Sequence, residues 1–413
     1  MRLEVGERIM TEKRLILVGS GSRRYRSYIV DAAVSMGIKI TLLTDKVVRW
    51  EKDLCDNILF VNIRDAEAMQ QRLYELMGAI KFDGIITYDE ELVIPTAELA
   101  QRLGLRYIKP ETAVAARNKY VMRSKLKENR IRVPEFVKIS DVEDFKKAIS
   151  IMNFPVVIKP IDGHSSIGVI KIETKEVAYR VFENVTHIKI NGRSQNTFIL
   201  EEYVKGKEIS VESLVYENEI LHFGITQKYT SSEPYFEEIG HSFPANISQS
   251  LRDEIISIVE KGIRALGINI GATHTELRLT SEGPVIIEIG ARLGGDRIPY
   301  LVYLATGANM AQETIKVALG IKPSIDILYN RGAAIRFIIP YKCGEIVEYP
   351  NLDKASNYPG ICEVSFKEQV GQIKLPPEGF FTRFGFVIAI ADQANEAYQK
   401  ACEAEKLIVI NIQ

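Results

Sequence analysis

Two glutamates in the second half of the chain have the spacing of a metal site. Glu276 and Glu288 lie in the stretch GATHTELRLTSEGPVIIEIGAR, each six residues from Glu282 in a predicted turn. An antiparallel hairpin about this turn would set their Cβ atoms about 4.5–5.5 Å apart, where like charges repel. A cation between them would relieve that repulsion, and oxygen ligands favour Mg²⁺. The alternative, two solvated glutamates on an exposed face, is disfavoured because Ile286 and Ile287 make both faces apolar.

The predicted hairpin brings further side chains to these glutamates. With side-chain alternation and a symmetric register, the shared face contains Ala272, His274, Glu276, Arg278, Ile286, Glu288 and Arg292. His274 is therefore a candidate for supporting a metal ligand or a substrate. Gly294 and Gly295 would let a substrate approach the backbone, although a turn into a helix explains them as well. His241, in PYFEEIGHSFPA, is a candidate for substrate recognition or for a structural role.

A glycine- and serine-rich segment follows the predicted strand VVIKP at residues 156–160. This segment, DGHSSIG at residues 162–168, can turn backbone N–H groups toward an anion, and Lys159 adds a positive charge. It is not a Walker A loop, because the lysine precedes the glycines and a strand follows them. The segment predicts a flexible phosphate cover, with a plain hairpin and an exposed Lys159 as the alternative.

The elements that must position these groups change character along the chain. Residues 1–112 alternate short apolar strands with helices, which predicts a parallel α/β domain. Its turn GSGSRR suggests dinucleotide binding, but that fingerprint needs a glycine where Arg24 stands. Later parts mix strands, hairpins and helices. The predicted helices cover residues 25–36, 66–77, 94–103, 118–130, 142–149, 249–266 and 394–405.

Composition and charge exclude several classes of protein. The chain has 413 residues, 46% of them apolar, which indicates a globular protein of two or three domains. Its net charge of −1 argues against nucleic-acid binding and against a polybasic membrane anchor. No apolar run reaches the roughly 18 residues of a membrane span, and no signal core opens the chain. Cys55, Cys343, Cys362 and Cys402 show no zinc spacing and predict a reduced, cytoplasmic compartment.

The motifs together resemble the ATP-grasp superfamily and, within it, the L-amino-acid ligases of the bacilysin type. NKYVMR, VVIKP, DGHSSIGV, LEEYVKGKE, THTELRL and IIEIGARLGG occur in order along nearly the whole chain. PYFEEIGHSFPA and GATHTELRL carry the likeness to the amino-acid ligases. The resemblance implies an α/β fold with an N-terminal parallel-sheet domain (1–112) and an ATP-grasp domain (113–322). The small lobe would span about 113–200, the large lobe about 201–322, and a C-terminal α+β closing region 323–413.

The resemblance also implies roles for individual residues. The expected ATP-binding residues are Lys119, Lys159, Gly163, His164, Ser165, Ser166, Gly168, Glu201, Glu202, Tyr203, Val204 and Glu208. Glu201 would accept from the adenine amino group, the Val204 backbone would complete the hinge, and Glu208 would reach the ribose. Glu276 and Glu288 would hold the metal. The expected catalytic residues are Arg292, Lys159 and His274, and the expected substrate contacts are His241, Arg292, Gly294 and Gly295.

The implied activity is ATP-dependent ligation of a carboxylate to an amine. A peptide bond between amino acids would form through an acylphosphate, with release of ADP and phosphate. The implied cofactors are ATP and Mg²⁺, with Mn²⁺ as an alternative, and a homodimer stays open. Many relatives read Glu-x-Asn-x-Arg, whereas Gly290 replaces the asparagine here, which leaves a second Mg²⁺ open. Two alternatives remain: a ligase acting on bicarbonate, a nucleotide-precursor amine or a carrier-bound amino acid, and a non-catalytic nucleotide-binding module.

Overall fold

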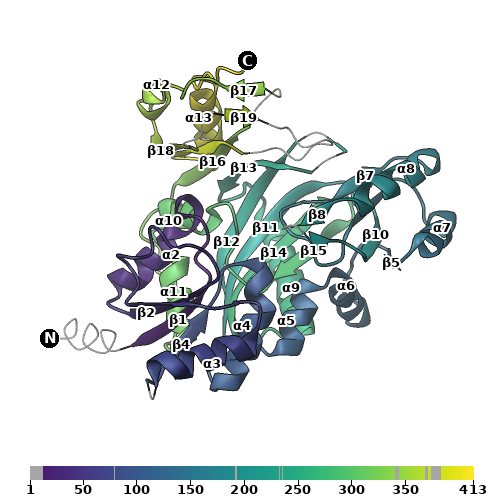
Figure 1. Cartoon of the computed structure of the whole chain (residues 1–413). Helices are drawn as coiled ribbons and strands as arrows, with labels where there is room; N and C mark the ends of the chain where they lie inside the picture. The colour runs from purple at the N-terminus through teal and green to yellow at the C-terminus, as the bar shows by residue number, and fades with distance from the viewer. Residues whose placement is uncertain are drawn as a thin grey trace.

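The computed structural model describes residues 13–78, 80–190, 193–231, 233–234, 236–339, 344–367, 371–373 and 383–413. Predictions that concern residues 1–12, Tyr235 and Cys343 lie wholly or partly outside this range. Figure 1 shows an N-terminal part, a small lobe and a C-terminal part arranged around a long central sheet. The predicted fold class, a parallel α/β domain followed by α+β lobes, is confirmed.

The N-terminal part is a parallel sheet with strand order β3-β2-β1-β4. Its strands are β1 (Arg14–Val18), β2 (Lys39–Thr44), β3 (Asn57–Phe60) and β4 (Gly84–Ile86). Its helices are α2 (Arg23–Ser35), α3 (Ala66–Met77), the 3₁₀ turn η1 (Glu90–Leu92) and α4 (Val93–Leu103). Neighbouring residues of β1, such as Leu15 and Ile16, enter different apolar clusters, because helices cover both faces of the sheet. The turn η1 follows β4 closely and brings Glu90 to the edge of the domain.

The small lobe is an antiparallel sheet with strand order β5-β10-β6-β7. Helices α5 (Pro110–Arg117) and α6 (Lys119–Glu128) lead into it. Its strands are β5 (Phe136–Ile139), β6 (Val156–Pro160), β7 (Ile170–Ile172) and β10 (Phe198–Glu202). Helices α7 (Val142–Ile151) and α8 (Lys175–Thr186) pack on it through Phe145 and Phe182, whose ring centroids lie 4.2 Å apart. A short ribbon, β8 (Lys189–Ile190) and β9 (Arg193–Ser194), completes the lobe.

The central sheet has eight strands in the order β15-β14-β11-β12-β13-β16-β20-β18. Its strands are β11 (Lys207–Tyr216), β12 (Glu219–Thr230), β13 (Glu238–Phe243), β14 (Gly271–Thr280), β15 (Gly283–Gly290), β16 (Gly332–Ile338), β18 (Ile361–Phe366) and β20 (Gly385–Ala391). The helices packed on it are α9 (Gln249–Leu266), α10 (Ile298–Thr306), α11 (Met310–Ala318) and α13 (Ala394–Lys406). The remaining elements are α12 (Asp353–Ser356), β17 (Gly344–Ile346) and β19 (Gly371–Ile373).

The domain limits expected from the sequence stay a prediction. Helix α5 crosses the limit placed at residue 112. The central sheet extends past residue 322, since β13 pairs with β16.

The hairpin of β14 and β15 confirms one predicted pairing and corrects another. Glu276 lies opposite Glu288, as predicted. The symmetric register is wrong, because the pairing shifts between Glu276 and Leu277, so that Leu277 lies opposite Ile286. Ile286 therefore does not share the glutamate face. It is fully buried with Leu277 in the core beneath α9, and Ile287 takes its place beside Glu288. An extra residue in one strand is a β-bulge, which redirects the side chains around it.

Candidate active site

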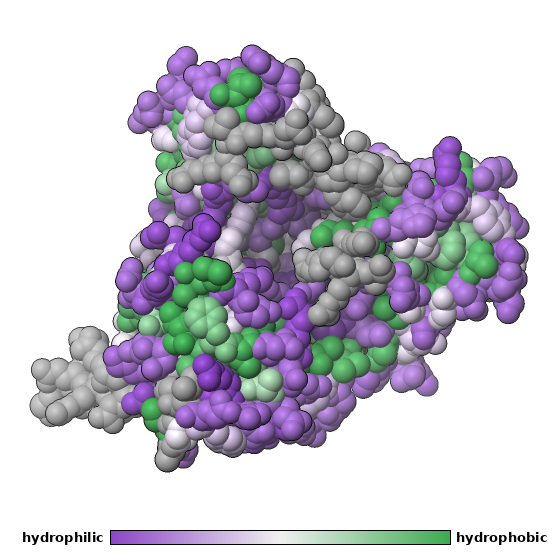
Figure 2. Space-filling view, in the orientation of Figure 1, coloured by the Kyte–Doolittle hydropathy of each residue, from purple (hydrophilic) through white to green (hydrophobic). Residues whose placement is uncertain are grey.

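A deep cleft separates the small lobe from the central sheet, and Figure 2 shows it as a polar hollow in the middle of the molecule. Its empty space is about 1230 Å³, mouth included, which is ample for small-molecule substrates. The expected site residues that line it are Lys119, Lys159, Gly163, His164, Ser165, Ser166, Glu201, Glu202, Tyr203, Val204, Glu208, His274, Glu276, Glu288, Arg292 and Gly295. Three expected site residues do not line the cleft but lie next to residues that do: Gly168, His241 and Gly294.

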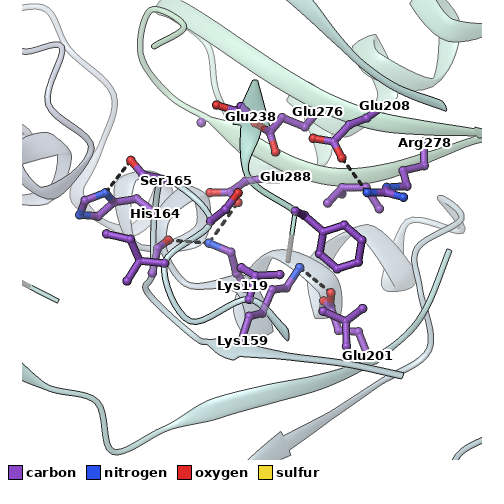
Figure 3. A pocket seen from close by; sticks show the side chains of 18 of the residues that line it. Lys119, Lys159, His164, Ser165, Glu201, Glu208, Glu238, Glu276, Arg278 and Glu288 are labelled. Atoms are coloured by element: carbon purple, nitrogen blue, oxygen red, sulfur yellow. Dashed lines mark hydrogen bonds and ion pairs between the residues drawn. The ribbon is translucent and has the colours of Figure 1, made fainter. Parts of the chain in front are cut away.

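Lys119 connects the loop after β6, residues 162–168, to the glutamate pair. It is the first residue of α6, and the side chain of Asn118 caps this helix by accepting from the Val121 amide. The Lys119 Nζ lies 2.7 Å from the Gly163 carbonyl oxygen and 3.0 Å from Glu288 Oε2 (Figure 3). A cation at this place can meet both a phosphate under the loop and the charge of a metal site.

The loop after β6 has the backbone of an anion cover. Ser165 and Ser166 both adopt φ of 55°, and Gly168 follows at 78°. A Cβ on Gly168 would lie 3.0 Å from Pro160, so this glycine sits against the strand end instead of facing the cleft. The Ser165 and Ser166 amides donate to no acceptor among the described residues, which leaves them for a ligand.

Glu201 is fixed by two buried cations. Its Oε2 lies 2.5 Å from Lys159 Nζ (Figure 3), and its Oε1 lies 2.8 Å from Nε of Arg123. Burial alone would raise the pKa of Glu201, but Arg123 and Lys159 lower it. Burial is also the main cause of the lowered pKa of Lys159. An adenine amino group would share Glu201 with these two cations.

The paired glutamates offer donors that suit a divalent cation. Glu276 Oε1 lies 2.5 Å from Lys228 Nζ, and Glu288 Oε2 contacts Lys119, as above. Lys228 also contacts Glu208 and Glu238, at 3.2 and 2.5 Å. Burial alone would lower the pKa of Lys228, but these carboxylates raise it well above its usual value. Carboxylate oxygens are the ligands that Mg²⁺ prefers, so the donor set fits this ion.

His274 stands between Glu276 and a buried carboxylate that the sequence did not single out. Its Nδ1 lies 2.9 Å from Glu212, and its Nε2 lies 3.3 Å from Glu276. Burial alone would lower the pKa of His274, but Glu212 and Glu276 raise it to about 9. Both ring nitrogens thus face a carboxylate, an environment that favours the protonated imidazole. A Cβ on Gly294 would lie 2.9 Å from Glu212, so the absence of a side chain there makes room for this pair.

Arg292 is held by Glu90, which comes from η1 in the N-terminal part. The Arg292 Nε contacts the Glu90 carboxylate, and Arg117 binds the same group at 3.0 Å. Burial alone would raise the pKa of Glu90, but Arg292 and Arg117 lower it to about 2. This contact orients one side of the Arg292 guanidinium, and the other side faces the cleft.

A charged quartet, Glu238, His241, Asp296 and Arg383, occupies the edge of the cleft beyond Glu276. Asp296 binds His241 Nε2 at 3.0 Å and Arg383 at 2.6 Å, and Arg383 lies 3.5 Å from Glu238. The Arg383 guanidinium stacks over Phe337 at 4.0 Å. Burial raises the pKa of Glu238, with Asp296 as a further cause, whereas Arg383 and His241 hold that of Asp296 well below its usual range despite burial. His241 does not line the cleft itself, but it contacts Asp296, which does.

Aromatic and cationic groups line the end of the cleft beside Tyr203 and Val204, which is called the hinge below. Arg278 binds Glu208 at 2.8 Å (Figure 3) and stacks on Phe236 at 5.1 Å. Tyr203 and Val204 follow β10 directly and complete this wall. Flat apolar surfaces beside backbone groups are suited to a nucleobase.

Sequence reasoning missed Glu90, Arg123, Glu212, Lys228, Glu238, Asp296 and Arg383 as members of the site, and it placed Arg278 on the glutamate face without giving it a role. A signal existed for Lys228, since a lysine at a buried position of a strand needs carboxylate partners. Glu90 and Arg383 carried no such signal, because their partners come from other parts of the chain.

Comparisons with known proteins identify domains along the chain. Family models match as an ATP-grasp N-terminal domain at residues 30–105, an ATP-grasp domain at 152–300 and an L-amino acid ligase C-terminal domain 2 at 336–413. No helix among the described residues has the length and apolar character of a membrane span.

Individual relatives point the same way. An L-arginine-specific L-amino acid ligase of Bacillus subtilis is 23% identical over 77% of this chain and 78% of its own. Alanine–anticapsin ligase of the same species is 29% identical over 62% of this chain, and the match spans only 58% of its length. The crystal structure of an L-amino acid ligase from Bacillus licheniformis is 25% identical, with a TM-score of 0.84 over 97% and 99% of the two chains. The chain therefore combines ATP-grasp domains with an L-amino acid ligase C-terminal domain, and it is related to the L-amino-acid ligases.

Proposed function

We propose that this protein joins two amino acids through a peptide bond, using ATP and releasing ADP and phosphate. The observation that carries the proposal is the charged quartet, which shares one cleft with the glutamate pair and Arg292. An α-amino acid brings an ammonium and a carboxylate together. The quartet offers two carboxylates, Glu238 and Asp296, beside the guanidinium of Arg383. Groups of both signs at one end of a cleft suit a zwitterion better than they suit bicarbonate.

The described residues can support the reaction without a nucleophilic side chain. An oxygen of the acid substrate attacks the γ-phosphorus of ATP, and the bond to the ADP oxygen breaks. The amine nitrogen then attacks the carbonyl carbon of the acylphosphate, phosphate leaves, and the nitrogen loses a proton. Lys119, Lys159 and Arg292 stabilise the negative charge on the phosphoryl oxygens, and the loop after β6 excludes water.

The cofactors proposed are ATP and Mg²⁺, with Mn²⁺ as an alternative. Glu276 and Glu288 would hold the ion, which when bound neutralises charge on the phosphates. Lys119 and Lys228 would keep these two carboxylates in place, since each already contacts one of them.

The test is a product assay with purified protein, ATP, Mg²⁺ and pools of amino acids. Expected products are ADP, phosphate and a dipeptide identified by mass spectrometry. Formation of AMP and pyrophosphate would contradict the acylphosphate route. Phosphate release that needs bicarbonate or a ribonucleotide amine, and not amino acids, would favour the other ligase classes. Tight ATP binding without turnover under every pool would favour a non-catalytic module.

A further inference from the structure

Lys228 is a buried cation at the junction of three carboxylates. Its side chain is 1% exposed, and Glu208, Glu238 and Glu276 lie 3.2, 2.5 and 2.5 Å from Nζ. These carboxylates come from three strands, β11, β13 and β14. One oxygen of each lies within 4.8 Å of the others, a spacing that would hold a divalent cation if the lysine were absent.

The oxygens of the glutamate pair are partly committed to fixed cations. Glu276 Oε1 contacts both Lys228 and His274, and Glu288 Oε2 contacts Lys119. Among the described residues, no donor contacts the other oxygen of either glutamate. Lys228 and Lys119 thus already place two positive charges on the glutamate pair, which weakens its attraction for a second divalent cation.

Position 290 gives an independent indication. Gly290, two residues after Glu288, supplies no side-chain ligand atom, and a Cβ there would lie 3.3 Å from Glu90 Oε2. Glu90 cannot easily take over as a ligand, because Arg117 and Arg292 already neutralise it. A larger side chain at 290 would therefore press on the group that holds Arg292.

We propose that the site takes one divalent cation, between Glu276 and Glu288, and that the Lys228 ammonium replaces a second one as a built-in positive charge. This inference rests on the proposed ATP-dependent function, since the ion would enter with the nucleotide. Lys228 acts as a positioning residue: it restrains Glu276, Glu208 and Glu238 together and prevents their three charges from recruiting a further ion.

The test counts metal ions and needs no acid or amine substrate. Free Mn²⁺ is measured from its electron paramagnetic resonance signal during titration of the protein saturated with ADP. The wild type should bind one Mn²⁺ per chain. Lys228→Met leaves three carboxylates without their cation and should bind a second Mn²⁺. Lys316→Met is the control, because Lys316 pairs with Glu313 on α11, away from the cleft lining, and its Mn²⁺ count should stay at one.

Each outcome decides the proposal. Two Mn²⁺ ions in the wild type would overturn it, and one ion in a folded Lys228→Met protein would overturn the role of Lys228. If Lys228→Met does not fold, Glu288→Gln decides: binding of Mn²⁺ should weaken at least tenfold. A tight ion that persists in Glu288→Gln would lie at the three-carboxylate cluster and contradict the proposal. Failure of the proposed ligase reaction would leave these counts unchanged.

Discussion

Part of the Arg292 guanidinium binds groups of the protein, and the rest lines the cleft. This arrangement is suited to charge that develops during phosphoryl transfer. Glu90 takes its Nε, and the Leu293 carbonyl accepts from one terminal nitrogen at 2.7 Å. A guanidinium can bind two phosphoryl oxygens in a fixed fork, which an ammonium cannot reproduce. Arg292→Lys should therefore lower kcat about 100-fold or more while ATP binding changes little. Steady-state kinetics and a nucleotide titration would measure the two effects.

A matched control is Arg336→Lys, because Arg336 is a half-buried arginine of β16 with partners outside the cleft, among them Glu405 at 3.9 Å. It should keep its kcat. Near-normal turnover of Arg292→Lys would show that Arg292 is a structural ion-pair partner, and that the catalytic face is assigned wrongly.

Glu90 links acid stability to the active site. Its pKa is lowered to about 2 despite burial, with Arg292 and Arg117 as the causes. A carboxylate with a lowered folded-state pKa stabilises the protein above its unfolded value of 4.5, and this stabilisation is lost as the pH falls toward 2. The shift corresponds to about 3 kcal/mol at neutral pH. The unfolding midpoint of the wild type should therefore drop more steeply between pH 5 and 3 than that of Glu90→Gln. Equal slopes would contradict this role of Glu90.

Residue types and local spacing predicted part of the site. Counting six residues to either side of Glu282 placed Glu276 opposite Glu288, and this pairing is correct although the symmetric register behind it is not. The turn has two residues, Ser281 and Glu282, and would by itself pair Glu276 with Ile287; the bulge makes Glu288 the partner. The bulge at Ile287 was not predictable in this way, since bulges depend on packing against other elements. Glu90 and Arg383 could not be found from spacing at all. Their partners, Arg292 and Asp296, lie 202 and 87 positions away in the sequence.

Helix α6 is the element whose placement matters most directly for Lys119, its first residue. Asn118→Ala removes the cap, and the loss should cost about 1 kcal/mol of stability. The same change should raise the KM for ATP, because Lys119 loses its fixed position. Ser248→Ala is the control, since Ser248 caps α9 by accepting from Leu251 and lies outside the cleft. It should lose similar stability without weakening ATP binding. Chemical denaturation and nucleotide titration separate the effects, and equal effects on ATP binding would contradict the prediction.

Strong periodicity predicted the first and last residues of some helices correctly, but other helices were missed. The helix expected at residues 249–266 is α9, with the same ends, because a serine cap and a glycine stop bound an amphipathic run. The helix expected at 66–77 is α3. Helix α8 was not predicted, since Val177, Val181 and Val185 favour strands and become helical through packing on Phe182 and β7. Helix α5 was also missed, although Pro110 marks its start.

At the scale of the whole molecule, contacts between residues far apart in the sequence hold the walls of the cleft together. Arg24 of α2 donates to the carbonyls of Phe366 and Phe384, and thus ties the first helix to the C-terminal strands. Arg297, next to Asp296, binds both the Arg24 carbonyl and Glu363. The turn that the sequence rejected as a dinucleotide fingerprint therefore leads into a structural junction. This junction lies next to Asp296, so α2 and the C-terminal part both contribute to the end of the cleft that the charged quartet occupies (Figure 1).

The small lobe and the central sheet also meet at the outer edge of the hinge. Lys171 of β7 binds Glu233, which follows β12, at 2.5 Å, and its amide donates to the Pro234 carbonyl at 3.1 Å. Its ammonium lies 4.2 Å from the ring centroid of Tyr203, whose hydroxyl donates to Glu233. A nucleotide bound beside Tyr203 would lie close to this contact, because Tyr203 and Phe236 line that end of the cleft.

Loss of this contact should speed nucleotide release. A half-exposed ion-pair network of this kind contributes about 1 kcal/mol, which corresponds to about a fivefold change in rate. Lys171→Met should therefore raise the dissociation rate of a fluorescent ADP analogue about fivefold in stopped-flow measurements. Lys146→Met is the control, because Lys146 pairs with Glu143 on the surface of α7 in the same lobe, and it should leave release unchanged. An unchanged rate in Lys171→Met would show that the two lobes separate elsewhere when the nucleotide leaves.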